Sequence, residues 1–575
     1  MKKSEPSFFD NNLKVGLALI IPAFVLYAKS LSFEFTSLDE QWMIIQNARY
    51  LEQWSFLKTL FVKNVAHIYY RPLFMLSLFI DFHIGKLSPF IYHFSNLIWH
   101  LGSVILLYRF LRFYDDTKKT AFFLSILFSV HPVLLHAVAW IPGRNDSMLT
   151  VFMLASLIHL NYYFQNETKK NLGLHVLFFG CALFTKETAT VFPLIYIALI
   201  YLQKNGQFKL ILKTSAYWLS IVLGWFVLRN ISIESIHTSG GNYTESIKGF
   251  FLSLIAYTGK AIIPLQQSIF PRVGDLPLIP GICALIIIVV LWFKPGLQNK
   301  KVALLGLFIF LLLLIIPVWY TVGQGAKEQY EHRIYAPLTG LFLFAVQLKS
   351  GRDNKILIYV ICFLSLLFFI RTYSRMDVYQ NKTTFAMAGT KDCPDYYLFH
   401  YQLGDLQLEK GNYEEALQNF KTALKMRPDM HRIYNNIGTT YYFLNDYQSA
   451  LPYFNKAISM CSFNPEYYRN RCVTYDRLND AQRAMSDLLV LRKCCGNIVP
   501  QAAEMEIAKK WDALYNGLTK KIMHDPTNAE FYFKRALLNF QIDRRPEGLA
   551  DLRAATGLDP ANEIYRKTLL KFSGK

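Results

Sequence analysis

The chain has 575 residues, of which 53% are hydrophobic, 16% aromatic and only 18% charged, and its mean hydropathy is positive. Soluble domains rarely combine so many apolar residues with so few charges, so the composition argues against a wholly soluble protein. The formal net charge of +20 would indicate nucleic-acid binding in a soluble protein, but here many Lys and Arg lie in short loops between apolar runs, where they set membrane topology.

The composition changes sharply along the chain. Long apolar runs extend to about Phe369, and the sequence after Asp377 is polar and charged. We therefore expect an all-α protein with a polytopic membrane domain over residues 1–375, a linker over 376–395 and a soluble domain over 396–575. The eight cysteines are scattered and show no spacing that would indicate zinc.

The membrane domain is predicted to contain eleven spans, because a spanning helix needs about 20 mostly apolar residues. The segments that fit are 13–31, 93–112, 120–139, 147–164, 172–185, 188–203, 212–230, 279–293, 302–320, 334–348 and 356–372. The first segment is not followed by a small-residue cleavage site, and we interpret it as an uncleaved signal anchor with Lys2 and Lys3 inside. The apolar stretch 249–263 is interpreted as an interfacial or re-entrant helix, because counting it as a span breaks the charge pattern.

The distribution of basic residues predicts an orientation for these spans. With the N-terminus in the cytoplasm, all five predicted cytoplasmic loops are basic, as the positive-inside rule requires. Their basic residues are Arg109, Arg112, Lys118 and Lys119; Lys169 and Lys170; Lys204, Lys209 and Lys213; Lys294, Lys300 and Lys301; and Lys349, Arg352 and Lys355. Because the number of spans is odd, we expect the C-terminal domain on the extracytoplasmic side.

The first extracytoplasmic loop carries Asp39-Glu40 and, further on, Arg71-Pro72. A carboxylate here can act as general base on a Ser or Thr hydroxyl, and a carboxylate pair can also hold a divalent metal. The alternative is an ordinary acidic loop at a membrane exit. The Arg71 guanidinium can bind a lipid phosphate, and the alternative is an interfacial anchor.

Further polar side chains recur on the same side of the predicted membrane. They are His93, Asn96 and His100 on one helix face; His131 and His136; Arg144, Asn145 and Asp146; Lys186 and Glu187; and Glu331, His332, Arg333 and Tyr335. For the histidines, hydrogen bonding between helices is favoured over metal ligation. Lys186 and Glu187 form either a simple ion pair or part of a binding site. The cations beside Glu331 either neutralise a phosphate leaving group or position a helix end.

The soluble domain contains a repeat with a period of 34 residues, typical of tetratricopeptide arrays. The residues in phase are Gly404 and Gly438; Ala416, Ala450 and Ala484; Phe420 and Phe454; Ala423 and Ala457; and Pro526 and Pro560. Clear units are predicted at 397–430 and 431–464 and weaker ones at 465–498 and 529–562, with a divergent stretch between. Such arrays form a concave groove for an extended peptide or a partner helix, and the alternative is a structural spacer.

In this order, the polar blocks resemble those of type C glycosyltransferases, in particular the transmembrane and tetratricopeptide repeat-containing protein O-mannosyltransferases and their bacterial relatives. The blocks are Leu38-Asp39-Glu40, Tyr70-Arg71-Pro72-Leu73, Tyr92-His93-xx-Asn96-xxx-His100, His131-Pro132-Val133, Ala139-Trp140-Ile141-x-Gly143-Arg144-x-Asp146, Lys186-Glu187 and Glu331-His332-Arg333-Ile334-Tyr335-x-Pro337. The resemblance covers nearly the whole chain, including the domain order. Animal members typically have Asp-Asp in place of Asp39-Glu40 and Glu-Arg in place of Glu331-His332-Arg333, so these departures fit a bacterial member.

The resemblance implies inverting transfer of a sugar, with mannose expected, from a polyprenyl-phosphate donor to Ser or Thr of exported proteins, with the repeats binding the acceptor. Asp39 would be the general base, and Glu40 would position Asp39 or the sugar. The residues expected to bind the donor phosphate are Arg71, Arg144, Lys186, His332 and Arg333. The further candidates for the site are His93, His131, Asp146, Glu187, Glu331 and Tyr335. No cofactor is implied, and a divalent metal is left open.

The same resemblance implies an inner-membrane protein with a cytoplasmic N-terminus and a periplasmic repeat domain. Two other functions fit part of the sequence. A membrane-anchored repeat scaffold for envelope assembly would explain the repeats, but one span would suffice as its anchor. A ligase or polymerase of lipid-linked glycans would explain the polar blocks without a protein acceptor. A transporter is disfavoured, because no inverted pair of Gly- or Pro-broken helices is found.

Overall fold

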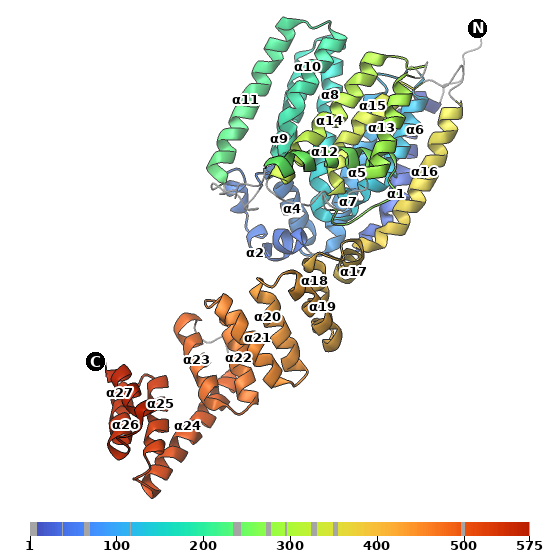
Figure 1. Ribbon diagram of the computed structural model, residues 1–575. Helices are drawn as coiled ribbons and strands as arrows, with labels where there is room; N and C mark the ends of the chain where they lie inside the picture. The colour runs from blue at the N-terminus through green and yellow to red at the C-terminus, as the bar shows by residue number, and fades with distance from the viewer. Residues whose placement is uncertain are drawn as a thin grey trace, which may run out of the picture. The chain divides into compact units, whose positions relative to one another are not determined.

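A computed structural model describes residues 8–36, 38–62, 69–115, 117–233, 243–271, 278–293, 296–323, 330–348, 355–495 and 501–573. Over these residues the chain is built from helices and forms no β-strand, which confirms the all-α prediction. The chain divides into two compact units, Met1–Cys393 and Pro394–Lys575 (Figure 1). Lys2, Lys3, Lys294, Lys349 and Arg352, on which the predicted orientation partly depends, lie outside the described residues.

The first unit is a bundle of apolar helices joined by short helical turns. Its longer helices are α1 (Asn12–Tyr27), α4 (Pro72–Gly85), α5 (Pro89–Leu111), α6 (Lys119–Ser129), α8 (Arg144–Asn166), α9 (Lys169–Thr185), α10 (Phe192–Gln203), α11 (Phe208–Ser232), α12 (Tyr243–Ile262), α13 (Leu278–Phe293), α14 (Lys300–Gly323), α15 (Tyr335–Ala345), α16 (Lys355–Met376) and α17 (Lys382–Asp392). The short ones are η1 (Phe8–Asp10), η2 (Ala28–Ser32), η3 (Gln41–Ile45), α2 (Ala48–Leu51), α3 (Phe56–Thr59), η4 (Pro132–Leu134), α7 (Leu135–Ala139), η5 (Ile141–Gly143), η6 (Glu187–Val191), η8 (Glu331–Ile334) and η9 (Asp377–Tyr379). The stretch 376–395, expected to be a linker, contains η9 and α17.

Every predicted span falls on a helix of the first unit. Among the described residues, six helices are long and apolar enough to cross a membrane: Asn12–Ser32, Pro89–Leu111, Ile141–Asn166, Phe208–Ser232, Lys300–Trp319 and Lys355–Tyr379. A seventh span is obtained if Lys119–Ser129 and Pro132–Ala139, which are bent by 50° relative to each other, are counted together. Pro132 lies at the bend, where it cannot continue the hydrogen bonding of α6. The other predicted spans are shorter helices, so the chain is a multi-pass membrane protein and the number eleven stays a prediction.

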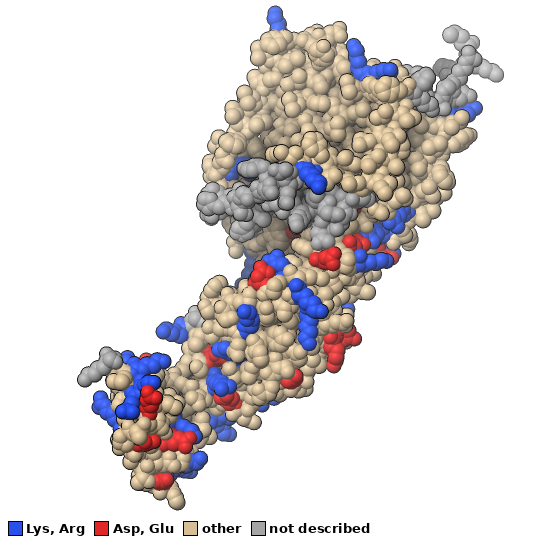
Figure 2. Space-filling model, viewed as in Figure 1, with Lys and Arg blue, Asp and Glu red and all other residues tan. Residues whose placement is uncertain are grey.

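The outer faces of the first unit suit a lipid environment. Leu219 in α11, Ile286 in α13 and Phe363 in α16 are exposed apolar side chains on helices that consist mainly of apolar residues. Figure 2 shows that the visible surface of this unit is mostly neutral, whereas Lys, Arg, Asp and Glu are interspersed over the second unit. A soluble protein rarely exposes apolar surface on this scale, and a membrane protein presents it to lipid.

Helices α14 and α15 approach each other closely because glycines face each other across their contact. A Cβ atom on Gly306 would lie 2.6 Å from the carbonyl oxygen of Gly340 and 2.7 Å from the backbone nitrogen of Phe344. Small residues give membrane helices this kind of contact, in which dispersion between backbones replaces the hydrophobic effect. The contact also places η8, which immediately precedes α15, against the rest of the unit.

We expect Gly306→Leu to destabilise the first unit by about 3 kcal/mol, because a side chain there must push two backbones apart. The measurement is the thermal unfolding midpoint of the full-length protein in detergent. Gly224→Leu in α11 is the matched control, since a Cβ at Gly224 meets no atom within 4 Å. Equal midpoints for the two variants would contradict the close approach of α14 and α15.

The second unit is a series of antiparallel helix pairs (Figure 1). The pairs are α18 (Tyr397–Glu409) with α19 (Tyr413–Met426), α20 (His431–Phe443) with α21 (Tyr447–Met460), α22 (Pro465–Arg477) with α23 (Ala481–Cys495), and α25 (Ala529–Gln541) with α26 (Arg545–Leu558). They coincide with the four predicted units. The divergent stretch contains one long helix, α24 (Gln501–His524), and α27 (Glu563–Ser573) ends the array.

The repeat period has a direct packing cause. A Cβ atom at Gly404 would lie 2.7 Å from the ring of Phe420, and one at Gly438 would lie 2.7 Å from the ring of Phe454. In the first two pairs, the glycine of the first helix therefore makes room for the phenylalanine of the second. This recurring fit explains why both residue types repeat every 34 positions.

Candidate active site

A cavity in the first unit brings together segments that are far apart in the sequence. It is bordered by the loop after α1, the start of α4, η5, the α9–α10 junction, α14 and η8. The lining residues are Asp39, Met43, Tyr69, Arg71, Trp140, Pro142, Asn145, Lys186, Glu187, Ile316, Pro317, Tyr330, His332 and Arg333. The predicted general base therefore shares one cavity with four of the five predicted phosphate ligands. The base is Asp39, and the four ligands are Arg71, Lys186, His332 and Arg333.

Asp39 follows Leu38, whose backbone is in the left-handed region with φ of 68°. Asp39 itself lines the cavity. The Nε1 of Trp42 donates to Asp39 Oδ1 over 3.2 Å. Burial raises the pKa of the Asp39 carboxyl, and the Trp42 hydrogen bond and the charge of Arg71 partly offset this rise.

Glu40 points away from the cavity and is fully buried. Its carboxylate accepts from the backbone nitrogen of Thr36, from Thr36 Oγ1 at 3.0 Å and from the backbone nitrogen of Ile141 at 3.1 Å. Burial raises the pKa of Glu40 to about 7, against the lowering effect of these hydrogen bonds. The contacts tie the Asp39 loop to η5, so Glu40 holds Asp39 in place from behind.

Arg71 lies at the N-terminal end of α4, immediately before Pro72. Its Nε and Nη2 donate to the two carboxylate oxygens of Glu187 over 2.9 and 2.5 Å, and its guanidinium lies 4.1 Å from the ring centre of Tyr69. Burial tends to raise the pKa of Glu187, but the charge and hydrogen bonds of Arg71 outweigh it and bring the pKa to about 2. This bidentate pair fixes the orientation of the guanidinium at the cavity wall.

Lys186 forms a second pair, with Asp146 of α8. Its Nζ donates to both carboxylate oxygens of Asp146 over 2.7 Å, and both side chains are buried. His332 Nε2 lies 3.8 Å from Asp146 Oδ2. Burial, the neighbouring His136 and nearby cations hold the pKa of His332 well below its usual value, so the ring is neutral. Adjacent Lys186 and Glu187 thus pair with different partners.

Arg144 is not brought to this cavity. Its fully buried guanidinium donates to Asn96 Oδ1 at 2.5 Å, Ser77 Oγ at 3.2 Å and the carbonyl of Tyr92 at 2.7 Å, and it lies 2.5 Å from a carboxylate oxygen of Asp81. These partners belong to α4 and α5. The structure therefore gives Arg144 a packing role, in which it joins α8 to both of these helices.

The candidate histidines on α5 also lie apart from the cavity. His93 is buried against Phe33, with ring centres 6.1 Å apart. His100 Nδ1 and the hydroxyl of Tyr335 are 2.6 Å apart, which joins α5 to α15. Tyr335 is fully buried and does not line the cavity. The prediction of hydrogen bonds between helices is confirmed for His100.

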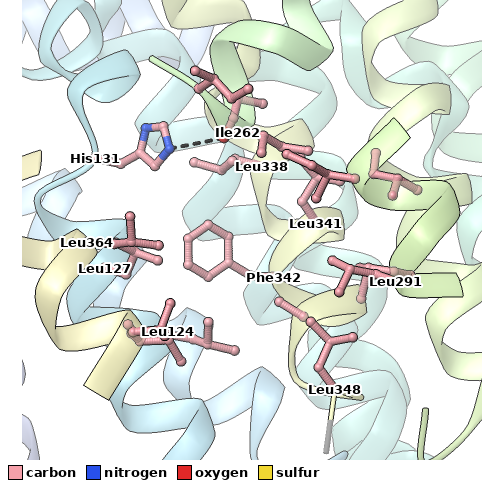
Figure 3. Close-up of a pocket in the computed structure, with 18 of the residues that line it drawn as sticks. Leu124, Leu127, His131, Ile262, Leu291, Leu338, Leu341, Phe342, Leu348 and Leu364 are labelled. Atoms are coloured by element: carbon pink, nitrogen blue, oxygen red, sulfur yellow. Dashed lines mark hydrogen bonds between the residues drawn. The ribbon is translucent and has the colours of Figure 1, made fainter. Parts of the chain in front are cut away.

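His131 lines a different, apolar cavity of about 490 Å³, between α6, α12, α13, α15 and α16 (Figure 3). Its Nε2 donates to the carbonyl of Ala261 over 3.1 Å, and its Nδ1 accepts from the backbone nitrogen of Val133. Both ring nitrogens are thus used to hold the bend after α6 against the end of α12.

Glu331 and Lys260 form a third buried pair, which was not predicted from the sequence. Lys260 Nζ donates to Glu331 Oε1 over 2.6 Å, and the same oxygen accepts from the backbone nitrogen of Ser268 over 3.1 Å. Lys260 is the one cation in the apolar stretch 249–263, and such a lone charge is itself a signal of a buried partner. The pair anchors η8 beneath His332 and Arg333.

Trp140, Asn145 and Tyr330 line the cavity without having been predicted as site residues. Gly143 allows the local turn that presents the first two, since a Cβ there would lie 2.6 Å from the carbonyl oxygen of His136. No group of three or more His, Cys, Asp or Glu side chains that could hold a metal occurs within the part of the chain that the structure describes.

Comparisons with known proteins agree with this architecture. Residues 72–232 match the family model described as dolichyl-phosphate-mannose-protein mannosyltransferase, and residues 401–465 match a tetratricopeptide repeat model. A protein O-mannosyl-transferase of Caenorhabditis elegans is 24% identical over 388 residues, covering 63% of this chain and 54% of that protein. Protein O-mannosyl-transferase TMTC1 of Homo sapiens is 23% identical over 480 residues, covering 70% and 54%. The chain spans about half the length of these curated relatives.

Among solved structures, the chain is similar to YrrB, described as a tetratricopeptide repeat protein with an unusual peptide-binding site. The sequence identity is 15% and the TM-score 0.21, over 32% of this chain and 96% of that one.

Proposed function

We propose that this chain, a relative of the transmembrane and tetratricopeptide repeat-containing protein O-mannosyltransferases, transfers a sugar, in our proposal mannose, from a polyprenyl-phosphate donor to Ser or Thr of exported proteins. The observation that carries the proposal is the shared cavity, in which Asp39 lies with Arg71, Lys186 and Arg333. A carboxylate beside several cations, in a unit built for the membrane, matches the demands of a reaction on a lipid-linked phosphate.

The reaction is a single displacement at the anomeric carbon of the sugar, with inversion. Asp39 accepts the proton of the acceptor hydroxyl as its oxygen attacks, and the bond from the sugar to the lipid phosphate breaks. The phosphate leaves as an anion and needs charge stabilisation more than a proton donor. Arg71, Lys186 and Arg333 supply positive charge, and the neutral His332 supplies a hydrogen-bonding ring.

The carboxylates around the cavity have a supporting role in this proposal. Glu187 orients Arg71 and Asp146 orients Lys186, each through two contacts. Glu40 holds the Asp39 loop against η5. Because these pairs are formed before the donor binds, the cations are already directed and little reorganisation is needed when charge develops.

The helix pairs of the second unit are proposed to bind the acceptor polypeptide, since stacked pairs of this kind expose a continuous concave face. This requires the repeats to be on the side of the membrane where the donor sugar is presented. The proposed location is the inner membrane, with the N-terminus in the cytoplasm and the repeats in the periplasm.

The test is transfer of radiolabelled mannose from polyprenyl-phosphate mannose to protein, in membranes that contain or lack the full-length chain. Protein-linked label that depends on the chain is the expected result. Label that accumulates on a lipid-linked glycan would instead indicate a ligase or polymerase. No chain-dependent label from any polyprenyl-phosphate sugar would contradict the enzyme and favour the scaffold.

A further inference from the structure

Several buried polar atoms at the candidate cavity have no hydrogen-bond partner in the described structure. They are Trp140 Nε1, Asn145 Oδ1 and His332 Nδ1, and all three residues line the cavity. Buried polar atoms are almost always paired, because an unpaired one has lost its bonds to water without replacement. The charged groups of the same cavity, Arg71, Glu187 and Lys186, all have partners. Unpaired buried polar atoms also occur elsewhere in the described structure, but these three gather at one cavity, where a bound ligand can supply their partners.

We infer that Trp140, Asn145 and His332 form the subsite that recognises the hydroxyl groups of the donor sugar. The inference rests on the proposed function and deepens it, because it assigns the residues that distinguish a sugar-bearing lipid from the bare lipid phosphate. Trp140 and Asn145 become specificity-determining residues, and His332 belongs to this subsite and lines the same cavity as the cations.

The hydrogen-bonding character of the three atoms identifies the ligand chemistry. Trp140 Nε1 can only donate. Asn145 Oδ1 can only accept, and the amide nitrogen of the same residue is already used by the carbonyl of Pro142 at 2.7 Å. With the ring proton on Nε2, the nitrogen 3.8 Å from an Asp146 carboxylate oxygen, the neutral His332 ring leaves Nδ1 as an acceptor.

One donor and two acceptors fit a set of hydroxyl groups, each of which both donates and accepts. A phosphate has only acceptor oxygens at its anionic face and would be repelled by two acceptors. An apolar polyprenyl chain would leave all three atoms unpaired. Of the three parts of a polyprenyl-phosphate sugar, the sugar alone satisfies this set.

Aromatic rings hold the subsite in shape. The rings of Trp140 and Tyr330 are stacked with centres 6.2 Å apart, and those of Tyr330 and His332 with centres 5.3 Å apart. His136 packs against both Trp140 and His332, with ring centres 4.8 Å away in each case. These ring contacts fix where Trp140 Nε1 and His332 Nδ1 lie at the cavity wall.

The experiment compares two equilibrium dissociation constants for the full-length protein in nanodiscs, one for polyprenyl-phosphate mannose and one for polyprenyl phosphate. The variants are Trp140→Phe, which keeps a ring and removes the donor, and Asn145→Leu, which removes the acceptor. Trp225→Phe is the matched control, because Trp225 is also buried with an unpaired Nε1 but does not line the cavity. Because both dissociation constants are measured on the same variant, a loss of folded protein does not change their ratio.

We expect wild type and Trp225→Phe to prefer the mannose-bearing lipid, and each cavity variant to lose about tenfold of that preference while its affinity for polyprenyl phosphate is unchanged. Cavity variants with the wild-type preference would overturn the subsite while the proposed function stands. A wild type that binds both lipids equally would overturn the proposed function itself.

Discussion

Asp39→Asn will lower the kcat/KM of sugar transfer by at least about 100-fold, because a general base contributes 10²–10⁴-fold and an amide cannot take the acceptor proton. The side chain keeps its shape, and its oxygen can still accept from Trp42. The measurement is chain-dependent transfer of labelled mannose, together with the dissociation constant of the donor lipid, which we expect to change little.

Glu34→Gln is the matched control for this variant. Glu34 is an exposed carboxylate in the same loop, five residues earlier in the chain, and does not line the cavity. The Glu34→Gln variant should transfer sugar at the wild-type rate. Equal transfer by wild type and Asp39→Asn would remove Asp39 from the mechanism.

The pH dependence of sugar transfer is a second test of Asp39 as the general base. Burial raises the pKa of Asp39, and only the deprotonated carboxylate can accept a proton. The wild-type kcat/KM should therefore fall as the pH decreases through this raised pKa, and the fall should be absent from the residual activity of Asp39→Asn. Burial raises the pKa of Glu40 to about 7, so the pH profile of Glu40→Gln shows whether Glu40, which holds the Asp39 loop, contributes to the wild-type profile.

Arg144→Met will destabilise the membrane unit by about 3–5 kcal/mol, because it leaves the buried Asp81 carboxylate without its cation. The hydrogen bonds to Asn96 and Ser77 are lost as well. The measurement is the thermal unfolding midpoint of the full-length protein in detergent, with and without donor lipid.

Arg109→Met is the control for Arg144→Met, since Arg109 lies exposed near the end of α5. It should unfold at the wild-type temperature. If Arg144→Met also unfolded at the wild-type temperature but bound donor phosphate more weakly, Arg144 would be a phosphate ligand, and its packing role would be secondary.

The helical class, the order of a membrane unit and a repeat unit, and the positions of the repeats could be predicted from the sequence. These features depend on short-range patterns: apolar runs of helix length, and small and aromatic residues that recur every 34 positions, with a glycine packed on a phenylalanine in the first two helix pairs. The order of polar blocks also identified Asp39, Arg71, Lys186, Glu187, His332 and Arg333, all of which the structure brings to one cavity.

The tertiary structure alone decided which charges are partners. Arg71 and Glu187 are 116 positions apart, and Lys260 and Glu331 are 71 apart, so no local spacing predicts either pair. Neighbours in sequence gave the wrong grouping: Arg144 and Asp146 lie two positions apart in α8, yet the first is buried among α4 and α5 and the second holds Lys186. The reason is that successive residues on a helix point in different directions, so the packing of surrounding helices decides what each side chain meets.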